Sequence, residues 1–130
     1  MDGSLDAMLA QVAARGGYEG SQQAARAVHH VLEVLGGHLV GDDRTDLARL
    51  LPEQCGPMLN AAEAVSEALT PGAFVEAVAL HGGDRRDEAR RAVTAVLPTL
   101  AELTDDALLR RILTQLPPGH AGLFGRVDPV

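Results

Sequence analysis

Apolar residues recur along this chain at the spacing of an α-helix. The clearest stretch has apolar side chains at the first, fourth, fifth and eighth positions, which places them on one helix face. It consists of Val28, Val31, Leu32 and Leu35, and the same pattern returns as Val93, Val96, Leu97 and Leu100. No segment shows the sustained alternation of apolar and polar residues that is typical of a half-buried strand. The pattern predicts an all-α protein.

The sequence contains two related copies of one segment. Residues 8–17 return as residues 74–83, and each stretch ends in a Gly-Gly pair. After a slip of one residue, the long helix and the segment that follows it also match. The matching positions include Ala24 and Ala89, Arg26 and Arg91, Ala27 and Ala92, Cys55 and His120, and the Leu-Pro pairs at 51–52 and 116–117. An ordered match of this length indicates an internal duplication.

Local signals predict where the helices begin and end. The glycine pairs end the first helix of each copy, because glycine readily takes the left-handed C-cap conformation. We expect Thr70 to cap the helix that follows it. We expect third helices over about residues 43–51 and 105–116, the second capped by Thr104. Three side chains of the earlier one are predicted to point inward: Leu47, Leu50 and Leu51.

We expect residues 1–130 to form a single domain, a compact helical bundle made of two related repeats of three to four helices. The repeats cover about residues 5–59 and 71–124. Residues 60–70 are rich in Ala and Glu and contain no helix breaker through residue 69, so they predict a helical linker or an extension of the fourth helix. A half of about 60 residues is marginal as an independent core, so we expect the two copies to share one core.

The composition agrees with this fold and narrows the chemistry. Apolar residues make up 46% of the chain and are nearly all Ala, Leu and Val, whereas aromatic residues make up only 2%. All 11 basic residues are arginine, which excludes a Schiff-base lysine and the lysine of a phosphate-binding loop. The net charge of −7 disfavours nucleic acid as a partner, because affinity for nucleic acid comes largely from neutralising phosphates.

The remaining global features concern location. A single cysteine cannot form an internal disulfide, which fits a reducing compartment. The N-terminal residues lack the basic and apolar regions of a secretory signal, and no apolar run is long enough to cross a bilayer. We therefore expect a cytoplasmic protein that binds neither nucleic acid nor a membrane.

The two copies together resemble a known bacterial family. The marks of the resemblance are Ala27-Val28 with Val31-Leu32-x-x-Leu35, Leu50-Leu51-Pro52, and the partners Ala92-Val93, Val96-Leu97 and Leu116-Pro117. This ordered set, over about residues 5–124, is similar to the family called domain of unknown function 2267. The resemblance implies a small all-α protein of two related halves, and it brings no established activity or catalytic residue. Two departures from an ideal repeat are Gly36-Gly37, which we expect to loosen the first long helix, and Pro98, which interrupts the second.

Histidines are the first candidates for chemistry. His29 and Glu33 lie four residues apart and face the same side of a helix, but a zinc site needs three or four ligands. A solvent-facing polar flank is the favoured interpretation of His29 and His30. We expect His38, His81 and His120 to stand alone. We therefore expect no metal and no cofactor.

Cys55 is the only candidate nucleophile with a thiol. A catalytic cysteine needs a nearby base to form its thiolate, and the sequence around Cys55 shows none. Its matching position in the second copy is His120, which argues against a duplicated catalytic site. We expect a small buried packing residue, and we expect no catalytic residues elsewhere.

An arginine cluster opens the second long helix. It consists of Arg85, Arg86, Arg90 and Arg91, interleaved with Asp84, Asp87 and Glu88. A salt-bridged solvated face is the first interpretation, with Asp87 and Arg91 as an i,i+4 pair. The alternative is a docking patch for an acidic surface. Residues 1–68 carry a net charge of −6 and residues 69–130 carry −1, so head-to-tail self-association is electrostatically feasible.

These features favour a non-enzymatic protein-interaction module, with an unidentified protein partner or a second copy of the chain as its target. The alternative is a binding protein for a small apolar ligand, held between the two copies where Ala-rich helices leave space. An enzyme is the third hypothesis, because the sequence shows no catalytic constellation.

Overall fold

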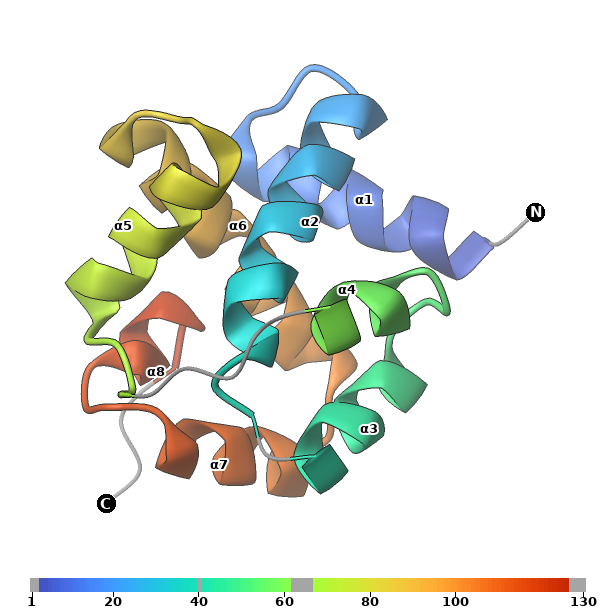
Figure 1. The fold of residues 1–130 in the computed structure, drawn as a ribbon. Helices are drawn as coiled ribbons and strands as arrows, with labels where there is room; N and C mark the ends of the chain where they lie inside the picture. Colours follow the sequence, from blue (N-terminus) through green and yellow to red (C-terminus); the bar gives the residue numbers. More distant parts are fainter. Residues whose placement is uncertain (1–2, 40, 62–66, 127–130) are drawn as a thin grey trace.

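The structure, a computed structural model, describes residues 3–39, 41–61 and 67–126. These residues form eight α-helices and no strand, which confirms the all-α class (Figure 1). No helix among them has the length and apolar character needed to span a membrane. The helices are α1 (Gly3–Gly16), α2 (Ser21–Gly36), α3 (Gly41–Leu50), α4 (Cys55–Ala61), α5 (Pro71–Gly82), α6 (Arg86–Leu103), α7 (Asp106–Gln115) and α8 (His120–Leu123).

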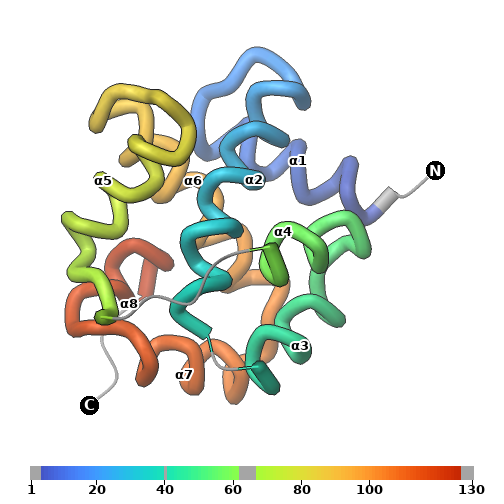
Figure 2. The backbone as a smooth tube through the Cα atoms, viewed as in Figure 1, coloured from blue at the N-terminus to red at the C-terminus, as the bar shows by residue number. Residues whose placement is uncertain are grey.

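The two long helices, α2 and α6, pack against each other at the centre of the molecule (Figure 1). Helix α1 packs on α6, and α5 packs on α2, so the first helix of each half lies against the long helix of the other half. Helices α3 and α7 are also in contact. The backbone trace places the α1–α2 loop and the α5–α6 loop at the same end of the molecule (Figure 2). The halves are therefore in contact through three helices each, α1, α2 and α3 on one side and α5, α6 and α7 on the other.

The predicted apolar stripes form the centre of the core. At most 1% of each of these residues is exposed: Val28, Val31, Leu32, Leu35, Val93, Val96, Leu97 and Leu100. Small residues bring the neighbouring backbones close. A Cβ atom on Gly36 would overlap the carbonyl group of Leu59, so the end of α2 can approach α4 only because residue 36 is glycine. Gly36 therefore serves a helix contact, and α2 remains helical up to it.

Several predicted helix ends are confirmed. The Thr70 hydroxyl accepts a hydrogen bond from the Ala73 amide (3.2 Å), and Gly83 ends α5 with a left-handed φ of 67°. The expected cap at Thr104 is wrong. Its amide instead bonds back to Leu100 at the end of α6, and the carboxylate of Asp105 caps α7 by accepting from the Leu108 amide (2.7 Å).

Two further expectations need correction. Leu50 was expected to point inward, yet it is 41% exposed, because Leu51 follows the end of α3 and turns into the core in its place. Of the helical linker expected over 60–70, residues 60 and 61 belong to α4, whereas residues 67–70 are not helical and Thr70 caps α5. Residues 62–66 lie outside the described part of the chain.

Matching positions of the two halves make matching contacts. In the first half the Cys55 thiol lies 3.9 Å from the sulfur of Met8. In the second half the residues at the same two positions, His120 and Phe74, meet with ring centroids 5.7 Å apart. These contacts support the internal duplication, which together with the boundaries 5–59 and 71–124 stays a prediction.

The shared core generates a test. We expect Leu32→Ala and Leu97→Ala each to lower the free energy of unfolding by about 2–5 kcal/mol, because each leaves a cavity in a fully buried site. Both variants are expected to shift one common urea transition, followed by circular dichroism. Two separate transitions, or cooperative folding of residues 1–68 and 69–130 as isolated monomers, would show that the halves are independent.

Candidate functional site

A polar pocket of about 400 Å³ opens where the two halves meet. Its walls come from α2, α5 and α6 and from the loops before α2 and α6, which lie together in Figure 1. Its volume falls in the range of small-molecule and side-chain binding sites. The lining consists of Tyr18, Gln23, Arg26, Ala27, His30, Val78, Asp84, Glu88, Arg91 and Ala92.

Four residues of the lining fall at positions that match between the predicted copies. They are Arg26 with Arg91 and Ala27 with Ala92. The alanines contribute small apolar side chains to the lining. Tyr18 and Gln23 come from the first half and Asp84 and Glu88 from the second, so the two sides of the pocket carry different groups.

The two arginines of the pocket each reach across to the other half. Arg91 of α6 donates from Nε to the carbonyl of Gly16 and from Nη2 to that of Gly17 (2.7 Å). Arg26 of α2 donates from Nη2 to the carbonyl of Gly82 (2.7 Å). Both arginines therefore bind carbonyl groups that the end of a helix leaves without intrahelical partners, and the cationic groups suit the negative end of the helix dipole.

The environments of the two guanidinium groups differ. Arg26 also pairs with the Asp84 carboxylate, at 3.1 Å. Arg91 instead lies over the ring of Tyr18, with its Cζ atom 4.5 Å from the ring centroid. Tyr18 can fold back in this way because residue 16 is glycine, where a Cβ atom would overlap the phenol ring.

Burial changes the titration of two residues of the lining. It raises the pKa of Tyr18 above its usual value of 10.0, against the opposing effect of the Arg91 charge. Burial also lowers the pKa of His30 below its usual 6.5, and the nearby His81 and Arg26 lower it further. At neutral pH the pocket therefore holds a neutral phenol and a neutral imidazole.

Next to the pocket, three histidines and one carboxylate form a chain of contacts. The predicted pair of His29 and Glu33 is present, and Glu33 also meets Nε2 of His81 at 3.3 Å. The Nδ1 atoms of His81 and His30 lie 2.8 Å apart. His81, expected to stand alone, therefore links α5 to α2. Within the described residues, no group of three or more His, Cys, Asp or Glu side chains has the arrangement of a metal site.

The other two histidines are buried and both contact Phe74, at centroid distances of 5.6 Å for His38 and 5.7 Å for His120. The sequence suggested that these two histidines stand alone, but each of them contacts other residues. His38 accepts a hydrogen bond from the Leu69 amide at Nε2 (3.2 Å), and its Nδ1 lies 3.1 Å from the Val34 carbonyl. His120 contacts the Pro117 carbonyl through Nδ1 (2.9 Å), while its buried Nε2 has no hydrogen-bond partner among the described residues.

Cys55 is buried, as expected for a packing residue, and it lies outside the lining of the pocket. Its contact with the thioether of Met8 places it in the core between α1 and α4. The thiol is thus part of the packing of the first half.

The four arginines of the expected patch make different contacts. Arg85 pairs with Glu88 at 3.2 Å, and Arg86 pairs with Glu76 at 2.7 Å. Arg90 and Arg91 are both exposed, but only Arg91 lines the pocket, where it binds the α1–α2 loop. The structure thus separates Arg91 from its neighbours, and this contact replaces the expected pairing with Asp87.

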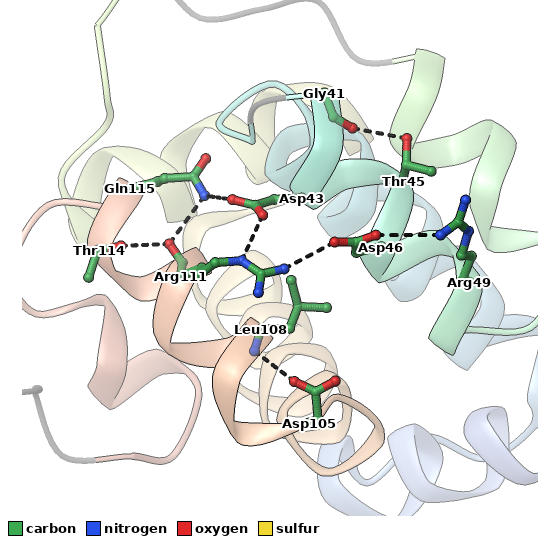
Figure 3. A network of polar contacts seen from close by, with 10 residues as sticks. All are labelled: Gly41, Asp43, Thr45, Asp46, Arg49, Asp105, Leu108, Arg111, Thr114 and Gln115. Atoms are coloured by element: carbon green, nitrogen blue, oxygen red, sulfur yellow. Dashed lines mark hydrogen bonds and ion pairs between the residues drawn. The ribbon is translucent and has the colours of Figure 1, made fainter.

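A second polar cluster joins the halves through α3 and α7. Figure 3 shows Arg111 of α7 between two carboxylates of α3, with Nε 3.0 Å from Asp43 and Nη2 3.0 Å from Asp46. Gln115 donates to the second oxygen of Asp43, which is only 8% exposed. These contacts satisfy a buried carboxylate and hold two helices together, so we interpret the cluster as structural.

Sequence reasoning singled out Arg91 but missed Tyr18, Gln23, Arg26 and Asp84. The signal that could have found them is the duplication itself. Arg26 and Arg91 occupy matching positions on the two central helices, and packing such helices around a common axis brings matching positions together. The glycine pairs were interpreted only as helix ends, although their carbonyls also bind both arginines.

Fold and site together define a small all-helical protein with a polar pocket to which both halves of the chain contribute. The chain belongs to the family described as Uncharacterized conserved protein (DUF2267), whose model matches residues 5–123. This match confirms the family that the sequence resembles. A comparison with curated proteins gave no match.

The Asp43 cluster predicts a difference between two substitutions. We expect Asp43→Ala to lower the free energy of unfolding by about 1–3 kcal/mol, because it removes the acceptor shared by Arg111 and Gln115. The control Arg49→Ala removes a side chain that is 75% exposed, and we expect a change within about 0.5 kcal/mol. Urea titrations of both variants measure the difference, and equal effects would contradict the structural role.

His120 predicts an effect of pH on stability. Burial lowers its pKa in the folded state, so the unfolded chain takes up a proton first as the pH falls below the usual value of 6.5. The contribution of the neutral His120 to the free energy of unfolding is therefore fully present above pH 6.5, and it is lost as the pH falls below that value. In His120→Asn, whose amide can still donate to the Pro117 carbonyl, we expect a smaller loss between pH 7 and about 5 than in the wild type. The free energy of unfolding is measured by chemical denaturation at several pH values. The same dependence on pH in the variant and the wild type would rule out this contribution.

Proposed function

We propose that this chain is a non-enzymatic interaction module, and that a polar group of a protein partner occupies the pocket between its two halves. The observation that carries the proposal is the pocket itself, whose volume of about 400 Å³ is large enough for a side chain or a chain terminus. Four of its ten lining residues are charged, so it favours a polar occupant.

The rim of the pocket is accessible from solvent. Gln23, Arg26, Glu88 and Arg91 are all exposed, and they come from α2 and α6, the central helices of the two halves. A group carried on the surface of another protein can therefore reach the lining without unfolding either half. The location also agrees with the expectation that a binding surface is formed by both copies.

The alternative of an apolar ligand finds little support in these contacts. A narrow apolar space lies among residues of α2, α3, α6 and α7, including Leu35, Leu47 and Leu100, but it has no volume that a water molecule could enter. A small polar molecule is a better second candidate, because the pocket has the volume and hydrogen-bonding groups that such a ligand needs.

The non-enzymatic role rests on the position of the reactive groups. Cys55 lies in the core against Met8, and His30 is the only histidine among the residues that line the pocket. We keep the cytoplasm as the proposed location and a protein as the proposed partner. Arg85, Arg86 and Arg90 face solvent beside the pocket and form the outer part of the proposed contact surface.

The proposal predicts where small probes bind. We expect a set of small polar fragments, titrated into the full ¹⁵N-labelled chain, to shift the amide signals of Tyr18, Gln23, Ala27 and Ala92. Ala92→Leu narrows the pocket and is expected to abolish these shifts, whereas Ala107→Leu, at an exposed position of α7, is expected to preserve them. Shifts that persist in Ala92→Leu, or that scatter over the surface, would refute the pocket as the binding site.

A further inference from the structure

We infer that the pocket recognises a carboxylate group and that Arg91 is the residue that binds it. The inference rests on the proposed binding role of the pocket and adds the chemical class of the occupant. It follows from a comparison of the charged groups of the lining, from the way in which Arg91 is held, and from the neutral groups around it.

Arg91 carries the one positive charge of the lining without a carboxylate partner. The lining contains two arginines and two acidic residues. Asp84 pairs with Arg26 at 3.1 Å, and Glu88 pairs with Arg85 at 3.2 Å. No carboxylate of the described residues lies within 4.0 Å of a guanidinium nitrogen of Arg91, whose partners are carbonyl groups and an aromatic ring.

The guanidinium of Arg91 is held in place before any ligand arrives. Its Nε and one hydrogen of Nη2 are engaged by the carbonyls of Gly16 and Gly17, and the Tyr18 ring lies against its face. A guanidinium has five N–H groups, so both hydrogens of Nη1 and the second hydrogen of Nη2 remain for a ligand. These donors lie at the end of the planar fork, where a carboxylate binds through both oxygens.

The neighbouring groups leave the charge of Arg91 uncompensated. Burial keeps Tyr18 in its neutral form, so its hydroxyl adds a donor and no negative charge. Gln23 is neutral, and its amide adds both a donor and an acceptor. Tyr18, Gln23 and Arg91 therefore each contribute at least one donor to the lining.

A carboxylate fits this arrangement better than a phosphate. One uncompensated positive charge balances a monoanion, whereas a phosphate dianion would leave a negative charge beside Asp84 and Glu88. The net charge of the chain, −7, opposes a dianion further. The remaining volume, beside Ala27, Ala92 and Val78, can accept the aliphatic part of an acidic side chain.

The test compares a peptide pair that differs in one group. The probes are acetyl-Ala-Asp-Ala-amide, its isosteric Asn analogue, free acetate and inorganic phosphate, each titrated into the full chain and followed by amide shifts. We expect the Asp peptide to bind about tenfold or more tightly than the Asn peptide, because a hydrogen bond to a charged group is stronger than a neutral one. Binding of the peptide that exceeds that of acetate identifies a protein as the source of the carboxylate, and equal binding identifies a small molecule.

Some variants are expected to weaken binding and one to strengthen it, which separates an effect on binding from an effect on folding. We expect Arg91→Gln to weaken binding of the Asp peptide by about tenfold or more. Arg91→Lys is expected to weaken this binding less, because lysine keeps the positive charge but lacks the paired donors of the guanidinium. Asp84→Asn removes a negative charge from the lining and is expected to strengthen binding severalfold. Arg110→Ala, at an exposed position of α7 outside the lining, removes the same charge as a control and is expected to bind like the wild type.

The outcomes distinguish this inference from the proposed function. If the Asp and Asn peptides bind equally at the pocket, or if phosphate binds more tightly than the Asp peptide, the carboxylate assignment is wrong and the binding role stands. If Asp84→Asn weakens binding of the Asp peptide, the negative charge of Asp84 does not oppose the ligand and the inference is wrong. This outcome is informative even if Arg91→Gln is unstable. If no probe shifts any signal of the lining, the carboxylate assignment and the proposed function both fail.

Discussion

The contact between α2 and α6 determines the rest of this structure. The stripes of branched apolar residues on these two helices are at most 1% exposed, and they share one core with α1, α4 and α5, which pack on the same two helices. Because α1 packs on α6 and α5 packs on α2, each half covers part of the long helix of the other, and we expect the two halves to share the hydrophobic free energy of folding. The pocket is a consequence, since it forms where the ends of these helices and the adjoining loops meet.

The sequence predicted the helices well because their signals are local. Apolar spacing identified α2 and α6, and Thr70 and the glycine pairs marked helix ends through their own hydrogen bonds. Errors arose where two adjacent residues compete for one role. Thr104 and Asp105 can both cap a helix, and Leu50 and Leu51 can both turn inward. The direction of the chain beyond the helix end decided each case, and the local pattern does not contain that information.

The site was less predictable, because it depends on side chains that are far apart in the sequence. Nothing around Tyr18 indicates that a guanidinium from residue 91 will lie on its ring, and nothing around His81 indicates a contact with Glu33. The four adjacent arginines looked like one patch because they are close in sequence. On a helix, successive residues point in different directions, so Arg90 and Arg91 face solvent and pocket respectively.

The mixed lining of the pocket has a consequence for how its specificity can change. In a dimer of identical subunits, any substitution at the axis appears twice, so the two walls of a central site always carry the same groups. Here Tyr18 and Asp84 line the same pocket from the two halves of a single chain, and each can be replaced without the other. One wall can therefore supply donors while the other supplies acceptors, and an asymmetric ligand can be bound in a single orientation.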